Sequence, residues 1–297
     1  MALNSFETFK NLFFKHASMF KKNFVAVQSE FGESWDADFD AHLEKLFKDD
    51  EGAYRDAIQG YVKFSLSAMR LQQRFNLTRK YEDATYQEVC ERVYLDEDQM
   101  MKWYLPGIFV SHFLWKHHYR QFLFHQNKFL PLLDSNPDKR FYEVGTGTGF
   151  YTVQLFRRYP QCVGHGIDIS PHSRQFTSNH VKAWGPDHSF VPLNVDINIA
   201  QLEPVPCIQS IEVLEHLSDP QLFLNNLRKL LMPGGYGFVA AAITAPEVDH
   251  IYLYWSPDDV IRQLNAAGFT VLDFEENPAY EGQPDELVPK VAAFIVS

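Results

Sequence analysis

The residues with the clearest chemistry lie between Glu143 and Gly149, where a carboxylate is followed by three glycines at alternate positions. An apolar run over residues 141–144 leads into them, as in a strand that turns tightly beneath a nucleotide. Dinucleotide sites use the spacing G-x-G-x-x-G, whereas Gly145, Gly147 and Gly149 read G-x-G-x-G. Glu143 stands at the end of the expected strand, where its carboxylate can reach a positively charged group. The pattern predicts a nucleotide-like cofactor without a phosphate group that the loop must bind.

Residues 143–149 resemble the first motif of the class I S-adenosylmethionine (SAM) dependent methyltransferases, and other motifs follow in the family's order. Asp168 ends the next apolar run and by resemblance would hold the ribose hydroxyls; an acid about twenty residues beyond the glycines suits ribose binding in general. Asp196 matches the acid beside the adenine amino group, and Ile197 the residue that packs on the ring. Residues 208–217 look like the family's fourth-strand motif, and 231–235 like its turn into the fifth strand.

The resemblance implies SAM as the cofactor, and a nicotinamide dinucleotide is the weaker alternative. The cofactor-binding residues that we predict are Glu143, Gly145, Thr146, Gly147, Gly149, Asp168, Ile169, Asp196, Ile197 and Glu212.

Methyl transfer requires alignment, exclusion of water and, for a hydroxyl or ammonium acceptor, a base. Ligands of open α/β sheets lie at the carboxyl ends of the strands. Glu215 and His216 follow the fourth expected strand and His250 follows the fifth, so these three residues are the predicted catalytic set. A lone histidine is more often a hydrogen-bonded structural residue than a base, because geometry decides the role.

Glu212-x-x-Glu215-His216 also resembles a metal-binding motif of small-RNA 2′-O-methyltransferases and of some ubiquinone-pathway O-methyltransferases, with His250 as an extra ligand. Carboxylate and imidazole together suit Mg²⁺, Mn²⁺ or Fe²⁺. The Glu-His pair is, however, widespread in metal-free relatives, and one short element supplies three of the ligands. We therefore predict no metal site.

Residues 133–297 alternate between strand and helix patterns after a turn-rich cluster at 133–138. Strands are expected near 140–144, 162–168, 189–195, 207–212, 236–243, 270–276 and 288–296, and helices near 149–158, 171–183, 219–231 and 256–267. The last two strands lack a helix between them, which fits an antiparallel hairpin at the sheet edge. The expected fold is α/β, a doubly wound seven-stranded sheet of the Rossmann-like methyltransferase type that forms a SAM-binding domain over 133–297.

Residues 1–132 are expected to form an all-helical N-terminal cap. Phe6, Phe9 and Phe13 recur at helical spacing, a break at Asp50 precedes a helix over 53–75, and Pro106-Gly107 starts a long helix over 108–130. Residues ahead of the first strand in such methyltransferases commonly form a lid that excludes water from the sulfonium. The predicted substrate-binding residues are His112, Trp115 and Tyr119 from this lid, together with Tyr252 and Tyr254 beyond the fifth strand.

Composition favours a small-molecule enzyme. The 297 residues carry a formal net charge of −11 and no basic stripe, which argues against a nucleic-acid substrate. Cys90, Cys162 and Cys207 are far apart, so we expect small core residues in a reducing compartment. A homodimer through the amphipathic N-terminal helices is left open.

Neither a signal peptide nor a membrane segment is expected. Charged residues from Glu7 to Lys15 interrupt any apolar N-terminal core, and the longest apolar run, 108–133, contains Lys116, Arg120 and Lys128. We therefore expect a cytoplasmic protein that does not bind a membrane.

The predicted function is SAM-dependent methylation of oxygen or nitrogen on a small metabolite, and two alternatives stay open. Some methyltransferase-like enzymes attack another carbon of the sulfonium and release methylthioadenosine by cyclising or transferring the aminocarboxypropyl group. No motif separates that outcome from methyl transfer. A SAM-binding partner subunit without turnover could instead use the large cap as an interaction surface.

Overall fold

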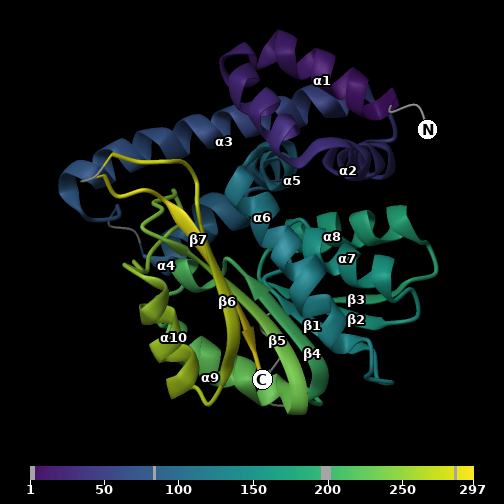
Figure 1. Cartoon of the computed structure of the whole chain (residues 1–297), viewed down its shortest axis with the longest axis vertical. Coiled ribbons are helices and arrows are strands. Elements are labelled where there is room, and N and C mark those ends of the chain that lie inside the picture. Colours follow the sequence, from purple (N-terminus) through teal and green to yellow (C-terminus); the bar gives the residue numbers. More distant parts are fainter. Residues whose placement is uncertain (1–3, 83–84, 195–201, 284–285) are drawn as a thin grey trace.

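A computed structural model describes residues 4–82, 85–194, 202–283 and 286–297 (Figure 1). Within these residues, seven strands form one sheet in the order β3-β2-β1-β4-β5-β7-β6. The strands are β1 Arg140–Val144, β2 Val163–Asp168, β3 Ser189–Asn194, β4 Val205–Ile211, β5 Leu231–Ile243, β6 Val271–Pro278 and β7 Lys290–Val296. β7 runs antiparallel to both β5 and β6, whereas the other neighbours are parallel. The doubly wound sheet and its antiparallel edge hairpin are confirmed.

Helices alternate with the parallel strands and cover both faces of the sheet. They are α7 Phe150–Arg158, α8 Pro171–Trp184, α9 Pro220–Leu230 and α10 Pro257–Ala266, close to the expected ranges. β5 begins at Leu231, earlier than the expected residue 236, because Leu231 already pairs with Val205 before the register shifts and pairing resumes between Cys207 and Tyr236. The alternation of buried residues along β5 explains the two layers: Phe238 and Ala240 face one cluster, while Val239 and Ala241 face the other.

All the regular secondary structure that is described before β1 is helical. Its α-helices are α1 Asn4–His16, α2 Lys21–Phe47, α3 Glu51–Thr78, α4 Tyr86–Val89, α5 Leu105–Leu114 and α6 Lys116–Phe124, joined in part by π-helical and 3₁₀ turns. Asp50 caps α3, since its side chain accepts hydrogen bonds from the Gly52 and Ala53 amides. Phe6, Phe9 and Phe13 all lie on the buried face of α1. The helical cap is confirmed.

The expected long helix over 108–130 is wrong. Trp115 has extended dihedrals, φ −101° and ψ 117°, and separates α5 from α6. Two side chains of α2 satisfy the carbonyls that end α5: Trp35 Nε1 donates to the Phe113 oxygen at 3.0 Å and Asn23 Nδ2 to the Leu114 oxygen at 2.8 Å. Partners distant in the sequence stabilise this break, so helical periodicity alone does not reveal it.

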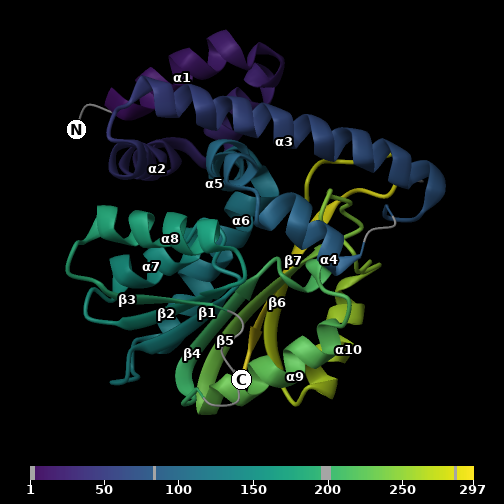
Figure 2. The ribbon, with the colours of Figure 1, turned by 180° about the vertical axis from the view of Figure 1, so that it is seen from behind.

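The cap and the sheet share one hydrophobic core. A single cluster of buried side chains extends from Phe6 and Trp35 in the cap to Phe141, Phe238 and Ile295 in the sheet. α3 crosses above the carboxyl ends of the strands and reaches the β6–β7 connection (Figures 1 and 2). There Gln72 Nε2 donates to the Leu287 carbonyl at 2.6 Å. The cap therefore closes the end of the sheet where the predicted site residues lie.

Candidate functional site

A cavity of about 690 Å³ lies between the carboxyl ends of the central strands and the cap. Its lining comes from the glycine turn after β1, from the ends of β2 and β4, from the segment after β5, and from α3, α5 and α6. The predicted site residues that line it are Glu143, Gly145, Thr146, Gly147, Asp168, Ile169, Glu212, His216, His250, His112 and Trp115.

The glycine turn has the backbone that its sequence requires. Gly145 has φ +80°, and an added Cβ there would lie 2.2 Å from Val213 Cγ2. Gly149 has φ +68°, and its Cβ would lie 2.6 Å from Thr177 Cγ2. Gly149 does not line the cavity; it caps the start of α7, where its N–H donates to the Thr146 carbonyl at 2.7 Å. Its role is therefore the close packing of α7 and α8.

Asp168 lies at the end of β2 with its carboxylate held by the backbone. Oδ2 accepts from the Gly147 N–H at 3.1 Å, and Oδ1 accepts from the Ser170 N–H at 2.8 Å. Burial raises the pKa of Asp168, and these two backbone hydrogen bonds oppose the shift. A carboxylate oxygen can accept further bonds, so the group can still hold two hydroxyls.

Glu143 is buried beneath the glycine turn. Its Oε2 accepts from Thr152 Oγ1 and from Gln209 Nε2, the latter at 2.8 Å. Burial raises the pKa of Glu143 to about 8, although both hydrogen bonds work in the opposite direction. A cation beside it would favour the ionised form.

His216 and Asp249 form a hydrogen-bonded pair in the cavity wall. His216 Nδ1 lies 3.1 Å from the Asp249 carbonyl, which can only accept, so Nδ1 carries the proton and Nε2 keeps a lone pair. Tyr94 and Tyr104 donate to Asp249 Oδ2 at 3.0 and 2.5 Å. Burial would lower the pKa of His216, but the Asp249 and Glu215 carboxylates raise it overall. This geometry fits a general base.

Glu215, His216 and His250 each offer one ligand atom to a common point, and these atoms lie within 4.8 Å of one another. Both carboxylate oxygens of Glu215 are buried without a hydrogen-bond partner. His250 Nδ1 lies 2.6 Å from the Ala245 carbonyl, an outer contact of the kind that orients metal-ligating histidines. The donor types fit a divalent cation, which would lower the pKa of an acceptor hydroxyl when bound. That no metal binds remains a prediction.

Burial raises the pKa of Glu215 to about 7 and lowers the pKa of His250 to about 3. A neutral His250 and a partly protonated Glu215 can therefore coexist without a cation at neutral pH. Glu212, beside them, has a left-handed backbone with φ +53° and accepts from Gln121 Nε2 at 3.0 Å. A non-glycine residue in this conformation is often found at functional sites.

Three predicted substrate contacts lie away from the cavity. Tyr119 is buried against Phe31, with ring centroids 4.7 Å apart. Tyr252 and Tyr254 both bond to Gln263 of α10, at 3.0 and 2.6 Å, so they face the opposite side of the sheet. The segment after β5 turns away after residue 250, which the spacing of the tyrosines does not reveal. Asp196 and Ile197 lie outside the described residues.

Sequence reasoning missed several lining residues. Tyr94, Tyr104, Glu247 and Asp249 line the cavity beside His216. Glu247 and Asp249 could have been found, because they follow the expected fifth strand at the sheet edge where His250 was singled out. Tyr94 carries no such signal, since it comes from another part of the helical cap. Tyr104 lies in the aromatic segment 103–120, which was the candidate for the lid, but its role at His216 was not predicted.

A family model described as a methyltransferase domain matches residues 142–236. The chain is 29% identical over 154 residues to a ubiquinone biosynthesis O-methyltransferase of Rhizobium etli, covering 45% of this chain and 61% of the relative. It is 35% identical over 99 residues to the protein of the same name from Caulobacter vibrioides, covering 33% and 38%. The matches thus span less than two thirds of the relatives' lengths.

Two solved structures share the fold. PigF with SAH has a TM-score of 0.51 at 12% identity, over 80% of this chain and 69% of that one. A Haemonchus contortus phosphoethanolamine N-methyltransferase 2 has a TM-score of 0.50 at 14% identity, over 72% and 60%. No helix among the described residues is both long enough and apolar enough to span a bilayer. The sheet order, the glycine turn, the matched domain and the named relatives together support a class I SAM-dependent methyltransferase.

Proposed function

We propose that the protein transfers the methyl group of SAM to a hydroxyl oxygen of a small molecule inside the cap. One observation carries the proposal: a single cavity of about 690 Å³ is lined both by the glycine turn with Asp168 and by His216 with its Asp249 partner. The cavity is large enough for a cofactor and a small acceptor together. The named relatives are O-methyltransferases, which favours oxygen over nitrogen.

SAM, when bound, supplies a methyl group on a positively charged sulfur that is already activated for displacement. Asp168 would accept hydrogen bonds from the ribose hydroxyls, and Glu143 would lie toward the ammonium. His216 Nε2 would accept the acceptor's proton as the new carbon–oxygen bond forms and the sulfur–carbon bond breaks. The Asp249 pair would stabilise the resulting imidazolium, and the cap would exclude water.

The test follows both sulfur-containing products by mass spectrometry. The purified protein is incubated with SAM alone and then with a fractionated metabolite extract. We expect S-adenosylhomocysteine only when the extract is present, together with a component that gains fourteen mass units. Methylthioadenosine without an acceptor would instead identify the cyclising or aminocarboxypropyl-transferring alternative. Neither product, despite SAM binding, would favour a partner subunit without turnover.

Two substitutions separate cofactor binding from chemistry. Asp168→Ala should abolish SAM binding by calorimetry, because the ribose ligand is lost. His216→Ala should keep SAM affinity within about twofold while lowering kcat by about 10²–10⁴, the usual contribution of a general base. Full activity in His216→Ala would exclude it as the base.

A further inference from the structure

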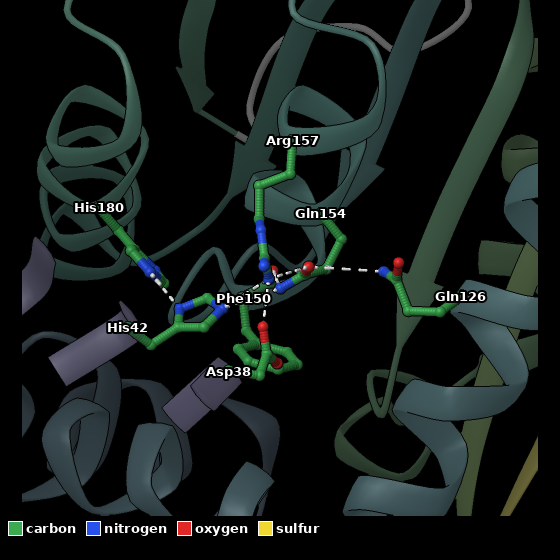
Figure 3. Close-up of polar contacts among 7 residues, drawn as sticks. All are labelled: Asp38, His42, Gln126, Phe150, Gln154, Arg157 and His180. Atoms are coloured by element: carbon green, nitrogen blue, oxygen red, sulfur yellow. Dashed lines mark hydrogen bonds and ion pairs between the residues drawn. The ribbon is translucent and has the colours of Figure 1, made fainter. Parts of the chain in front are cut away.

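A chain of buried hydrogen bonds joins the cap to the glycine turn behind the cavity. His42 of α2 and His180 of α8 are fully buried, and His42 Nδ1 lies 3.3 Å from His180 Nε2. His180 Nδ1 lies 3.0 Å from the Thr148 carbonyl. On the other side, His42 Nε2 lies 3.2 Å from Gln154 Nε2 and 3.3 Å from an Arg157 guanidinium nitrogen (Figure 3). We call Arg157, His42, His180 and the Thr148 carbonyl the histidine relay.

The two ends of the histidine relay determine where its protons lie. A carbonyl only accepts, so His180 Nδ1 must carry a proton. A neutral imidazole has one donor and one acceptor, so His180 Nε2 accepts from His42 Nδ1. His42 Nε2 then accepts from Arg157, whose guanidinium only donates. Every bond is matched only when both rings are neutral with the proton on Nδ1.

The surroundings keep both rings neutral. Burial lowers the pKa of His180 to about 4 and lowers that of His42 well below its ordinary value. Arg157 is itself anchored to the cap, since it pairs with Asp38 of α2 at 2.6 Å. An additional proton on either ring would make two N–H donors face each other without an acceptor. The relay therefore has a single arrangement of its protons.

The relay ends on the backbone that lines the predicted cofactor site. Thr148 lines the cavity, and its hydroxyl lies 3.4 Å from His112 Nε2 of α5. The preceding carbonyl, of Gly147, accepts from Thr177 Oγ1 at 3.1 Å, and the Gly147 N–H donates to Asp168 at 3.1 Å. His180 therefore holds the same stretch of backbone that orients Asp168. Neither His42 nor His180 is among the described residues that line the cavity.

We propose that His42 and His180 are positioning residues for SAM, and that the cap fixes the glycine turn through them. The inference rests on the proposed SAM site and adds that cofactor affinity depends on a cap side chain outside the cavity. His42 reaches the Thr148 carbonyl only through His180. Its ring also packs on Phe150, a contact that phenylalanine at position 42 would keep. Docking of α2 is thereby coupled to the geometry of the turn.

The first test is a double-mutant cycle on SAM affinity in the full chain, measured by calorimetry. His42→Phe and His180→Phe keep an aromatic ring and remove the hydrogen bonds. We expect each to weaken SAM binding by about tenfold, the upper range for one lost hydrogen bond. The double variant should bind no more weakly than His180→Phe alone, because both substitutions interrupt the same path.

Trp35→Phe is the matched control. It removes a buried hydrogen bond in the same cap, from Nε1 to the Phe113 carbonyl, outside the histidine relay. It should lower Tm while leaving SAM affinity within about twofold of the wild type, because the relay is intact. The positioning role is refuted if His42→Phe binds SAM as well as Trp35→Phe does. It is also refuted if the losses of binding free energy in the two single histidine variants add up in the double variant. Absence of SAM binding by the wild-type protein would refute the proposed function instead.

A second measurement on the wild-type protein does not depend on the variants folding. Nitrogen NMR of protein labelled at histidine reports the tautomer of each ring. We expect His42 and His180 to carry the proton on Nδ1, and we expect both signals to shift when SAM is added. A proton on Nε2 of either ring, or His42 signals insensitive to saturating SAM, would overturn the relay.

Discussion

Glu143 illustrates how burial and a predicted ligand charge act together on one residue. Burial raises its pKa to about 8, so the free protein holds it mostly protonated at pH 7. The SAM ammonium would favour the carboxylate, and we expect binding at pH 7 to release close to one proton. Calorimetry in buffers of different ionisation enthalpy measures this release. Glu143→Gln should bind SAM more weakly and release correspondingly less; equal release by both proteins would exclude Glu143 as the source.

The same shift has a consequence for the stability of the ligand-free protein. The pKa in the folded state lies above the ordinary value of 4.5. The shift therefore makes a stabilising contribution to the free energy of unfolding. This contribution is fully present below about pH 4.5 and is lost as the pH rises through about 8. Denaturation by urea at a series of pH values should show that Glu143→Gln removes part of this loss.

The His216–Asp249 pair predicts how the rate of turnover depends on pH. His216 must be neutral to accept a proton, and its pKa is raised above 6.5 by the neighbouring carboxylates. The rate should therefore rise with pH through an inflection above 6.5. Asp249→Asn should move the inflection downward and lower kcat, because the imidazolium loses its partner. A pH–rate profile for both proteins checks this, and an unchanged inflection would show that the pair does not act.

Metal content can be decided directly at Glu215, His216 and His250. We expect protein purified without chelator to contain no stoichiometric Mg²⁺, Mn²⁺, Fe²⁺ or Zn²⁺, and chelation to leave the rate unchanged. Elemental analysis with His250→Ala as the control is the measurement. One equivalent of metal in the wild type that is lost in His250→Ala would show a metal site built from the unpartnered Glu215 carboxylate.

At the scale of elements, α3 packs closely on α5 and on the helical turn before it, and residues of both helices line the cavity. An added Cβ at Gly60 would lie 2.3 Å from the Trp103 carbonyl, and one at Gly107 would lie 2.7 Å from the backbone of Gly60. Gly60→Ala or Gly107→Ala should therefore lower the free energy of unfolding by about 1–3 kcal/mol, despite alanine's higher helix propensity. Chemical denaturation measures this.

Gln59→Ala, on the exposed face of α3, is the control for that measurement. It should change stability by no more than about 0.5 kcal/mol. If Gly60→Ala and Gly107→Ala are equally neutral, α3 and α5 can separate without cost, and the roof of the cavity is less constrained than the contact indicates.

At the scale of the molecule, the cap and the sheet should unfold together. The division at residues 132 and 133 is a prediction from sequence, yet one buried cluster continues from Phe6 to Ile295 across it. We expect a single endotherm in scanning calorimetry, which shifts upward as a whole when SAM is added. Two endotherms, only one of them sensitive to SAM, would show that the cap is an independent folding unit.

The sequence by itself determined the order of strands and helices, the glycine turn and the acid after β2. These depend on local rules: glycine tolerates positive φ, strands read as apolar runs, and the carboxyl ends of parallel strands meet at one edge. Glu143, Asp168 and His216 were predicted for this reason, because each stands at or just beyond the end of a strand.

Only the tertiary structure decided what faces the site from the cap. Trp115 breaks a helix because Trp35 and Asn23 satisfy the carbonyls of α5, and Tyr94 reaches Asp249 from a helical segment 155 residues away in sequence. The histidine relay likewise joins three helices and the glycine turn, whose separations along the chain follow no period. Such contacts depend on how packed faces meet in space, and a pattern read along one chain does not contain that information.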